Sequence, residues 1–530
     1  MKPSSKTFMA AAFLCTLFPS SSVTAATFVW DGGGGADTNW SNNLNWVDDL
    51  LPTSAADTLI RFGGTAGNRV QNISTPFVLN RLEFLTAGSP ESAITTSGNQ
   101  LQFSGADALV FSTRNATGAI GNAIHLGTGT NLSFHVTTFG VNLNGIITGE
   151  GGITKLAHAG GVTLTNSGNT FSGGIVYNGF SGATSWNHFV VSASGAMGTG
   201  LLQINGGATG VWNGTAGHQP GGVIFRGTTS HNNNIRLLTN SPIYAELPNS
   251  SSTTTNVTLN GNIDGQTHTL FLRGRGQGNI VGNYTSTGGL NKMDANMWTL
   301  SGTNVYSGAT DVSRTAVNEA TVAGPVHSTL NVNGSISGTS SITVNTAAVL
   351  AGIGSITTQG SGAGQTLIKT GGFLAPGNAL TNKTGTLTLT AQLAFETGSF
   401  WELNLSGTSH STLSLDGSLN LTGATLVAGS TFAPINDTQY WLLDHDDAST
   451  RTGMFSNFVA TAPVGSYVDA NGHFVLNGIT FAAYLNANFG TGATSGGNDI
   501  LLYAVPEPSR NLLGLIALAA CVLKRKRARA

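Results

Sequence analysis

Two segments of this chain are similar to each other, and that repetition constrains the fold more than any other feature. Gly151 to Gly179 reads GGITKLAHAGGVTLTNSGNTFSGGIVYNG, and Gly288 to Ser313 reads GGLNKMDANMWTLSGTNVYSGATDVS. Each copy has a Gly-Gly pair followed by an aliphatic residue, a polar residue and lysine, and later an Asn-X-aromatic-Ser-Gly stretch. Both predict three short strands separated by tight turns. One such unit cannot bury its apolar face alone, so we expect the units to stack as a solenoid.

The predicted strands alternate between apolar and polar residues. Thr386 to Thr390 reads TLTLT, and Leu419 to Gly429 reads LNLTGATLVAG. Because successive side chains of a strand point to opposite faces, we expect Leu, Val and Ile inside and Thr, Ser and Asn outside. Glycine and asparagine supply the positive φ that the corners need. We therefore predict an all-β chain folded as a right-handed parallel β-solenoid.

The composition supports this class and excludes others. Charged residues make up 9% of the chain, against about 25% in ordinary globular proteins. The aliphatic content excludes a disordered chain, and the 14 prolines are too few for collagen. Residues 27–504 carry 14 Lys and Arg against 23 Asp and Glu, which argues against a nucleic-acid partner. Cys15 and Cys521 lie in the terminal apolar segments, so the body can form no disulfide or thiolate metal site.

The first 26 residues have the pattern of an export signal. Lys2 and Lys6 precede an apolar run from Phe8 to Phe18, and small residues follow as far as Ala26. This order is typical of a secretory signal peptide. We predict export through the Sec translocon, with cleavage after Ala25 or Ala26.

The last 26 residues combine three elements in a fixed order: a Pro-Glu-Pro motif, an apolar run from Leu512 to Leu523, and a basic end. The motif is Pro506, Glu507 and Pro508, and the basic end begins with Lys524, Arg525, Lys526 and Arg527. This order resembles the PEP-CTERM sorting signal of Gram-negative bacteria. The resemblance implies a short helix held transiently in the inner membrane, with its basic end in the cytoplasm, and an exosortase-type membrane protease acting near Pro-Glu-Pro. A permanent single-pass anchor is the alternative, although 12 apolar residues are fewer than the roughly 20 of a relaxed span.

The two similar segments resemble the autotransporter-associated β-strand repeat of bacterial passenger domains. The phrase LAPGN, from Leu374 to Asn378, is also typical of those passengers. The resemblance implies a secreted, passenger-like solenoid and names no catalytic residue. Only 19 residues separate Asn486 from Pro506, so we expect no translocator barrel, and export would depend on the sorting machinery.

Three tryptophans, Trp30, Trp40 and Trp46, lie close together among Gly, Asn and Asp residues near the start of the body. Indole faces can stack on pyranose rings, which makes these residues candidate glycan contacts. The interpretation that we prefer is that they close one end of the β body and cover its open edge.

The sequence shows no clear catalytic constellation. The densest carboxylate group is Asp444, Asp446 and Asp447; in a strand only the first two would share a face, and the alternative is a solvated turn. The stretch GGNDILLY, from Gly496 to Tyr503, resembles a Ca²⁺-binding nonapeptide but occurs once, without tandem copies. The histidines form no HxH or HExxH pattern. We therefore assign no catalytic residue, metal ligand or cofactor.

We divide the chain into five parts: signal peptide (1–26), Trp/Gly-rich cap with the first rungs (27–125), repeat solenoid (126–430), C-terminal β region (431–504) and sorting signal (505–530). The predicted function is a structural or adhesive protein of the cell surface or extracellular matrix, in an envelope or biofilm rich in exopolysaccharide. The alternatives are a β-helix polysaccharide lyase or hydrolase, whose carboxylates from distant rungs would converge in one groove, and a passive spacer.

Overall fold

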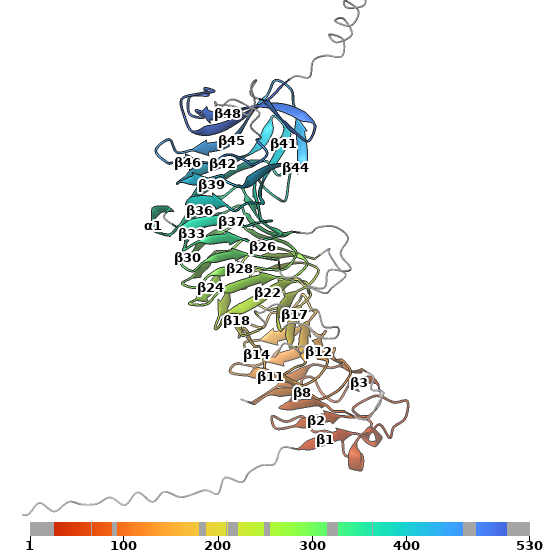
Figure 1. The fold of residues 1–530 in the computed structure, drawn as a ribbon. Helices are drawn as coiled ribbons and strands as arrows, with labels where there is room; N and C mark the ends of the chain where they lie inside the picture. The colour runs from red at the N-terminus through yellow and green to blue at the C-terminus, as the bar shows by residue number, and fades with distance from the viewer. Residues whose placement is uncertain are drawn as a thin grey trace, which may run out of the picture.

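The computed structural model describes residues 26–64, 66–86, 93–105, 107–179, 187–207, 209, 221–247, 255–314, 327–362, 364–458 and 473–505. These residues form an elongated rod along which the chain advances in order from one end to the other (Figure 1). Ala26 is described, whereas Ala25, the Pro-Glu-Pro motif and the apolar run that follows it lie outside the described residues. None of the helices in the described ranges is long and apolar enough to cross a membrane.

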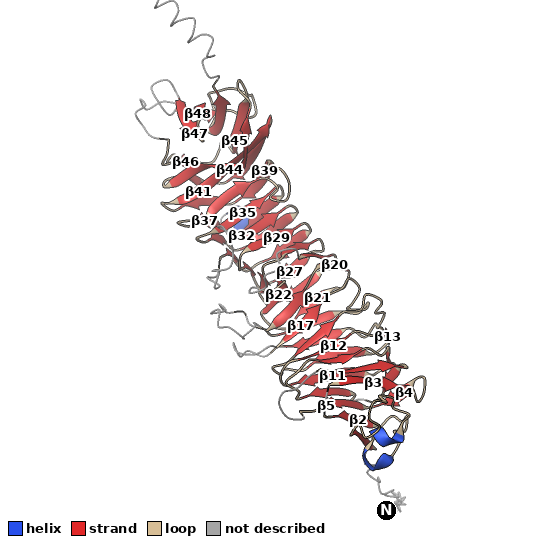
Figure 2. Ribbon diagram, turned by 90° about the vertical axis from the view of Figure 1, so that its right-hand side faces the viewer, coloured by secondary structure: helices blue, strands red, loops and turns tan. Residues whose placement is uncertain are grey.

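Parallel strands stack along the rod in three sheets, and the chain visits the sheets in turn. In the first sheet, for example, Ile263 pairs with Tyr284 and Thr285 pairs with Val305. The chain therefore completes one rung and returns to the same sheet about 20 residues later. Figure 2 shows the stacked strands along the whole rod. The predicted parallel β-solenoid is confirmed.

The first sheet runs the length of the rod and continues into a C-terminal antiparallel extension. Its parallel strands are β1 (Thr27–Trp30), β2 (Leu59–Phe62), β5 (Arg81–Phe84), β8 (Leu109–Ser112), β11 (Asn131–Val136), β14 (Gly152–Lys155), β16 (Ile175–Asn178), β18 (Leu202–Asn205), β21 (Ile235–Leu237), β24 (Ile263–Gln266), β27 (Tyr284–Ser286), β30 (Thr303–Tyr306), β33 (Ser335–Thr339), β36 (Ser355–Thr358), β39 (Gly385–Thr390), β42 (Ser409–Asp416) and β45 (Gln439–His445).

The second sheet also spans the rod. Its strands are β3 (Gly67–Gln71), β6 (Ile94–Gly98), β9 (Gly118–Ile120), β12 (Gly140–Leu143), β15 (Gly161–Leu164), β17 (His188–Val191), β19 (Gly222–Phe225), β22 (Ser241–Ala245), β25 (Leu270–Arg273), β28 (Leu290–Lys292), β31 (Thr310–Val312), β34 (Ile342–Val344), β37 (Gln365–Ile368), β40 (Gln392–Phe395), β43 (Leu419–Asn420) and β46 (Arg451–Thr452).

The third face of the rod carries two separate groups of strands, referred to together as the third sheet, and β41 (Ser399–Gly407) of the second group also pairs antiparallel with β42 of the first sheet. The N-terminal part consists of β4 (Phe77–Leu79), β7 (Leu101–Phe103), β10 (Ile124–Leu126) and β13 (Ile147–Gly149). The C-terminal part consists of β20 (Thr228–His231), β23 (Asn256–Leu259), β26 (Gln277–Ile280), β29 (Asn296–Leu300), β32 (Ser328–Val332), β35 (Ala348–Gly352), β38 (Phe373–Pro376), β41 (Ser399–Gly407) and β44 (Ala424–Pro434). A short helix, α1 (Gln359–Gly362), lies on the side of the rod (Figure 1).

The interior is filled by the apolar half of each alternating strand. In β39, Leu387 and Leu389 are buried, whereas Thr386 and Thr388 between them are exposed. The TLTLT pattern therefore has the orientation expected of it. LNLTGATLVAG also alternates, but a turn divides it between β43 and β44.

Outward asparagines add side-chain hydrogen bonds between neighbouring rungs. The backbone N–H of Asn262 donates to the side-chain oxygen of Asn234 at 2.9 Å. The backbone N–H of Asn283 donates to the side chain of Asn262, also at 2.9 Å. Thr303 N–H donates in the same way to Asn283 at 2.8 Å. This asparagine ladder links four successive rungs without any charged group.

The two similar segments fold alike but begin on different sheets. In the first copy the lysine ends β14 of the first sheet, and in the second it ends β28 of the second sheet. Lys155 and Lys292 are both buried and donate to backbone carbonyls of the following turn. The first copy contains the three predicted strands, β14, β15 and β16, whereas the second contains four, β28 to β31.

A buried asparagine has the same role in both copies. Asn169 accepts the N–H of Ile147 at 2.8 Å and donates to the carbonyl of Ala196 at 2.7 Å, so it joins three rungs. Asn304 accepts the N–H of Tyr284 at 3.1 Å and donates to the carbonyl of Ser335 at 2.9 Å. The internal repetition therefore encodes one rung with its turns.

The two ends of the rod are closed in different ways. At the N-terminal end, Trp40 N–H donates to Val70 of β3, and two short 3-10 helices, η1 (Asn43–Asn45) and η2 (Val47–Asp49), follow (Figure 2). At the C-terminal end, β47 (His473–Leu476), β48 (Ile479–Ala487) and β49 (Asp499–Ala504) add to β45 in antiparallel order. The predicted boundaries at 125 and 430 fall within β10 and β44.

Candidate functional site

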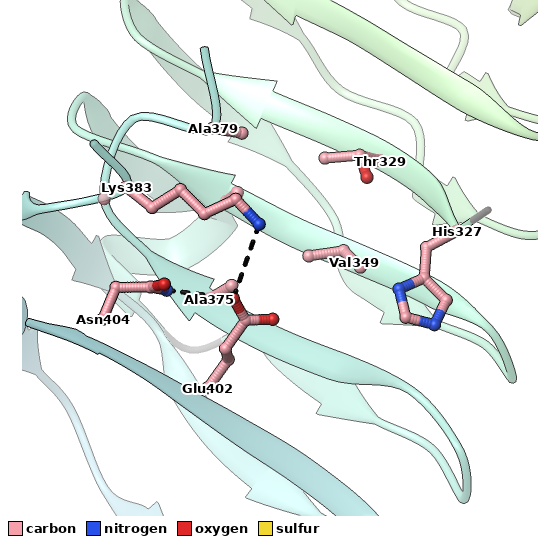
Figure 3. A pocket seen from close by; sticks show the side chains of 10 residues that line it. His327, Thr329, Val349, Ala375, Ala379, Lys383, Glu402 and Asn404 are labelled. Atoms are coloured by element: carbon pink, nitrogen blue, oxygen red, sulfur yellow. Dashed lines mark hydrogen bonds and ion pairs between the residues drawn. The ribbon is translucent and has the colours of Figure 1, made fainter. Parts of the chain in front are cut away.

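A hollow of about 80 Å³ lies on the outer face of the third sheet (Figure 3). It crosses β32, β35, β38 and β41, and the connection from β38 to β39 covers one side of it. Its lining residues are His327, Thr329, Val349, Ala351, Ala375, Gly377, Ala379, Lys383, Glu402 and Asn404. These residues come from four rungs, so only stacking brings them together.

The floor of the hollow is made of small apolar side chains. Ala351 pairs with Ala375 across β35 and β38, and both are buried although they point away from the rod interior. Val349 belongs to the same separate apolar cluster, and Ala379 of the covering connection packs against it. Small side chains at these outward positions leave the space that larger ones would fill.

Asn378 fixes the covering connection to the rod. Its side-chain oxygen accepts hydrogen bonds from the side chains of Asn331 and Asn333, and the N–H of Ala379 donates to Asn331 at 3.2 Å. Gly377 has a φ of +112°, and a Cβ there would lie 2.0 Å from the carbonyl oxygen of Lys383. The LAPGN phrase therefore specifies both the anchor and the sharp bend that lead to the hollow.

One end of the hollow is polar. Asn404 donates to the Oε1 of Glu402 at 3.0 Å, and the N–H of Thr431 donates to Asn404 at 3.2 Å, which fixes the amide. Lys383 Nζ lies 3.7 Å from the same Oε1, which is beyond hydrogen-bond length. The side chain of Lys383 is 34% exposed and that of Glu402 15% exposed. The pair therefore presents a donor and an acceptor together with almost no net charge.

His327 forms the opposite end (Figure 3). Its ring lies 4.6 Å from the ring of Phe373, which in turn stacks on Phe400 at 4.7 Å. Burial lowers the pKa of His327, and the carboxylate of Glu402 opposes that shift. At neutral pH the imidazole is therefore uncharged and adds a polar, non-ionic wall.

A second hollow, of about 150 Å³, lies on the outer face of the second sheet. Gly140 and Gly161 occupy paired positions of β12 and β15 in its floor. Its walls are formed by Thr117, Phe139, Asn142, Thr163, His188 and Arg226. Burial lowers the pKa of His188 to about 4, so this imidazole is also neutral. Arg226 pairs with Glu246 at 3.2 Å.

The burial of Trp30, Trp40 and Trp46 does not support the candidate glycan contact and agrees with their role as an end cap. Trp40 and Trp46 have no exposed surface and Trp30 has 6%. Their rings pack edge to face on one another, with centroids 5.1 to 5.8 Å apart, and Trp46 Nε1 donates to the carbonyl of Trp40 at 2.9 Å. Because a sugar cannot reach the face of a buried indole, these residues close the end of the solenoid, as the preferred interpretation of the sequence expects.

The aspartates near the C-terminal end form a turn. β45 ends at His445, so Asp444 and Asp446 do not share a strand face. Exposed Asp446 accepts the N–H of Ala448 and the hydroxyl of Ser449. The solvated turn is therefore confirmed.

The carboxylate of Asp499, in the GGNDILLY stretch, has a structural role. It accepts the N–H groups of His445 and Phe489, each at 2.6 Å, and so holds the C-terminal strands together. Within the described ranges, no group of three or more His, Cys, Asp or Glu side chains is arranged to hold a metal ion.

Sequence reasoning missed the residues of the first hollow. Its one signal was the LAPGN phrase, which marks the covering connection but not the facing strands. The predicted sorting positions, from Pro506 to Arg527, lie outside the described residues, and their role stays a prediction.

Comparison with protein-family models finds no match to the chain. Comparison with curated proteins finds no match either. We therefore infer the function from the geometry of the rod and of the two hollows described above.

Proposed function

We propose that this chain is a structural or adhesive rod of a bacterial cell surface or extracellular matrix. It is exported through its N-terminal segment and sorted through its Pro-Glu-Pro tail. Its outer faces contact exopolysaccharide. The observation that carries this proposal is the solenoid itself, whose outside is covered by hydroxyl and amide groups held in register.

The rod is well suited to a stable extracellular role. Its core is a continuous stack of buried aliphatic and aromatic side chains from Trp30 to Ala504. No thiol is needed, because both cysteines lie outside the body. Hydrogen bonds between successive rungs pair most of the described strands on both sides, which limits aggregation.

The outer faces offer uncharged hydrogen-bonding groups at regular spacing. The asparagine ladder of Asn234, Asn262 and Asn283 is one such row. Thr386 and Thr388 are exposed on β39. Rows of this kind match the hydroxyl-rich surface of a polysaccharide in their hydrogen-bonding chemistry.

The alternative of a lyase or hydrolase required carboxylates from distant rungs in one groove. Of the described residues that line the hollows, one in the first hollow is a carboxylate, Glu402, and none in the second is. Glycosidases generally use a pair of carboxylates. This observation favours the structural role.

The proposal is tested by co-sedimentation of the purified chain with insoluble polysaccharides, together with intact mass measurement of the protein recovered from its native envelope. We expect retention on at least one polysaccharide, no release of soluble sugar, and loss of the residues that follow the Pro-Glu-Pro motif. Failure to bind any polysaccharide would overturn the adhesive role, and a mass that retains Lys524 to Ala530 would overturn sorting by cleavage.

A further inference from the structure

We infer that the hollow between β32 and β41 binds the acetamido group of an N-acetylated sugar. The inference rests on the proposed contact with polysaccharide and adds the class of sugar that is recognised. The site is the convergence of an alanine-lined floor with the Lys383–Glu402 pair, in one cavity on the outer face of the rod (Figure 3).

An acetamido group carries a methyl, an N–H donor and a carbonyl acceptor within a few bonds of one another. The hollow presents a complement to each. Ala351, Ala375 and Val349 form the apolar floor for the methyl. Glu402 accepts from the N–H, and Lys383 donates to the carbonyl oxygen.

Both polar groups are free to make these bonds. Asn404 and Lys383 engage the Oε1 of Glu402, and no hydrogen bond from a described residue reaches its Oε2. The Nζ of Lys383 lies 3.7 Å from Oε1, which is too far for a hydrogen bond between them. The amide of Asn404 and the backbone of Thr431 hold the carboxylate in place before any ligand arrives.

The charges of the site select against other sugars. Lys383 and Glu402 compensate each other, so a carboxylate on the ligand would meet Glu402 and an ammonium would meet Lys383. A plain hydroxyl would satisfy one polar partner and leave the alanine floor exposed to water. An uncharged group with both polarities and a methyl is the best match.

The size of the hollow agrees with a substituent and not with a whole ring. Its volume is about 80 Å³, whereas a single water needs roughly 10–15 Å³ of such space. A group of several non-hydrogen atoms therefore fits. The pyranose ring would remain outside the hollow.

The test uses the full chain and saturation-transfer NMR with N-acetylglucosamine, with glucosamine as the matched ligand that lacks the acetyl group. We expect saturation to be strongest at the acetyl methyl and absent for glucosamine. Ala375→Leu fills the floor and should weaken binding about tenfold or more, equivalent to 1.4 kcal/mol. Glu402→Gln and Lys383→Met should each weaken it severalfold.

The control variant is Ala394→Leu, the same change at a partly exposed position of β40 in the second sheet. It should leave the methyl saturation unchanged, and circular dichroism should show that both leucine variants are folded. Equal saturation by the two sugars, or full saturation with Ala375→Leu, would overturn the site.

The experiments distinguish failure of the acetamido site from failure of the adhesive role. Retention on polysaccharides regardless of acetylation would overturn the acetamido site and keep the adhesive role. Methyl saturation by the monosaccharide without retention on any polysaccharide would keep the site and overturn the adhesive role.

Discussion

The two similar segments are built alike, yet they begin on different sheets of the solenoid. The first copy has Ala157 two residues after its lysine, and the second has Asp294 at the same place. Asp294 pairs with Arg273 of the preceding rung inside the protein, where the two side chains are 0% and 1% exposed. The repeat therefore encodes the rung and its turns, whereas residues that differ between the copies, such as Asp294, decide which additional interactions a copy makes.

The largest effect should come from breaking the ion pair that only the second copy has. Asp294→Asn keeps the shape and the positive φ of 64°, but it leaves the buried Arg273 without its counter-charge. We expect the free energy of unfolding to fall by about 3–5 kcal/mol, measured by guanidinium unfolding of the full chain.

The matched control for this change is Asp264→Asn. Its ion pair with Arg236 is 40% and 45% exposed, so the loss should stay below about 1 kcal/mol. Equal effects of the two variants would mean that burial does not distinguish these ion pairs.

A second pair of variants tests whether the copies are equivalent despite their different sheets. Asn169→Ala and Asn304→Ala each remove hydrogen bonds to the rungs before and after. Each should cost about 2–3 kcal/mol, because buried backbone groups lose their partners. Hydrogen exchange should show loss of protection at Ile147 in the first variant and at Tyr284 in the second. A large difference between the two costs would contradict the shared role.

The buried lysines predict a pH dependence that both copies share. Burial lowers the pKa of Lys155 and of Lys292 to about 7, from 10.5. Between these values the folded state binds fewer protons than the unfolded state, so stability should rise as the pH increases from 7 towards 9. The slope is at most about 1.4 kcal/mol per pH unit for each lysine.

Thermal unfolding at pH 7, 8 and 9 measures this slope. Lys155→Met and Lys292→Met should each remove part of it, and the double variant should remove most of it. If the slope is unchanged in the double variant, other groups are responsible for it.

The smallest expected effect concerns the aromatic residue of each copy, Phe171 in the first and Tyr306 in the second. The Tyr306 hydroxyl lies 2.7 Å from that of Thr310. Tyr306→Phe makes the second copy resemble the first and should cost about 1 kcal/mol. Phe171→Tyr is the reciprocal change; a cost near zero would show that the first copy also has a partner for the hydroxyl.

The sequence predicts the stacked strands because each rung carries its own signals. Leu387 and Leu389 alternate with threonines, and buried positions follow that alternation without reference to other rungs. The shift of the second copy by one sheet was not predictable, since it depends on insertions between rungs that a local pattern does not record.

The candidate site was less predictable than the fold. In the sequence, Ala375 and Ala351 are ordinary small residues of a strand. They form the floor of the hollow only because the two strands pair. His327 and Glu402 lie on different rungs, so no spacing rule connects them. The tryptophans illustrate the opposite case, because a cluster visible in the sequence proved to be buried against Phe62 and Phe77.

The stacking of the rungs has a mechanical consequence. Each rung advances the chain along the rod by one strand spacing, about 4.8 Å. The number of rungs therefore sets the length of the rod. Removing one whole rung would bring the groups held at its two ends closer together by one strand spacing.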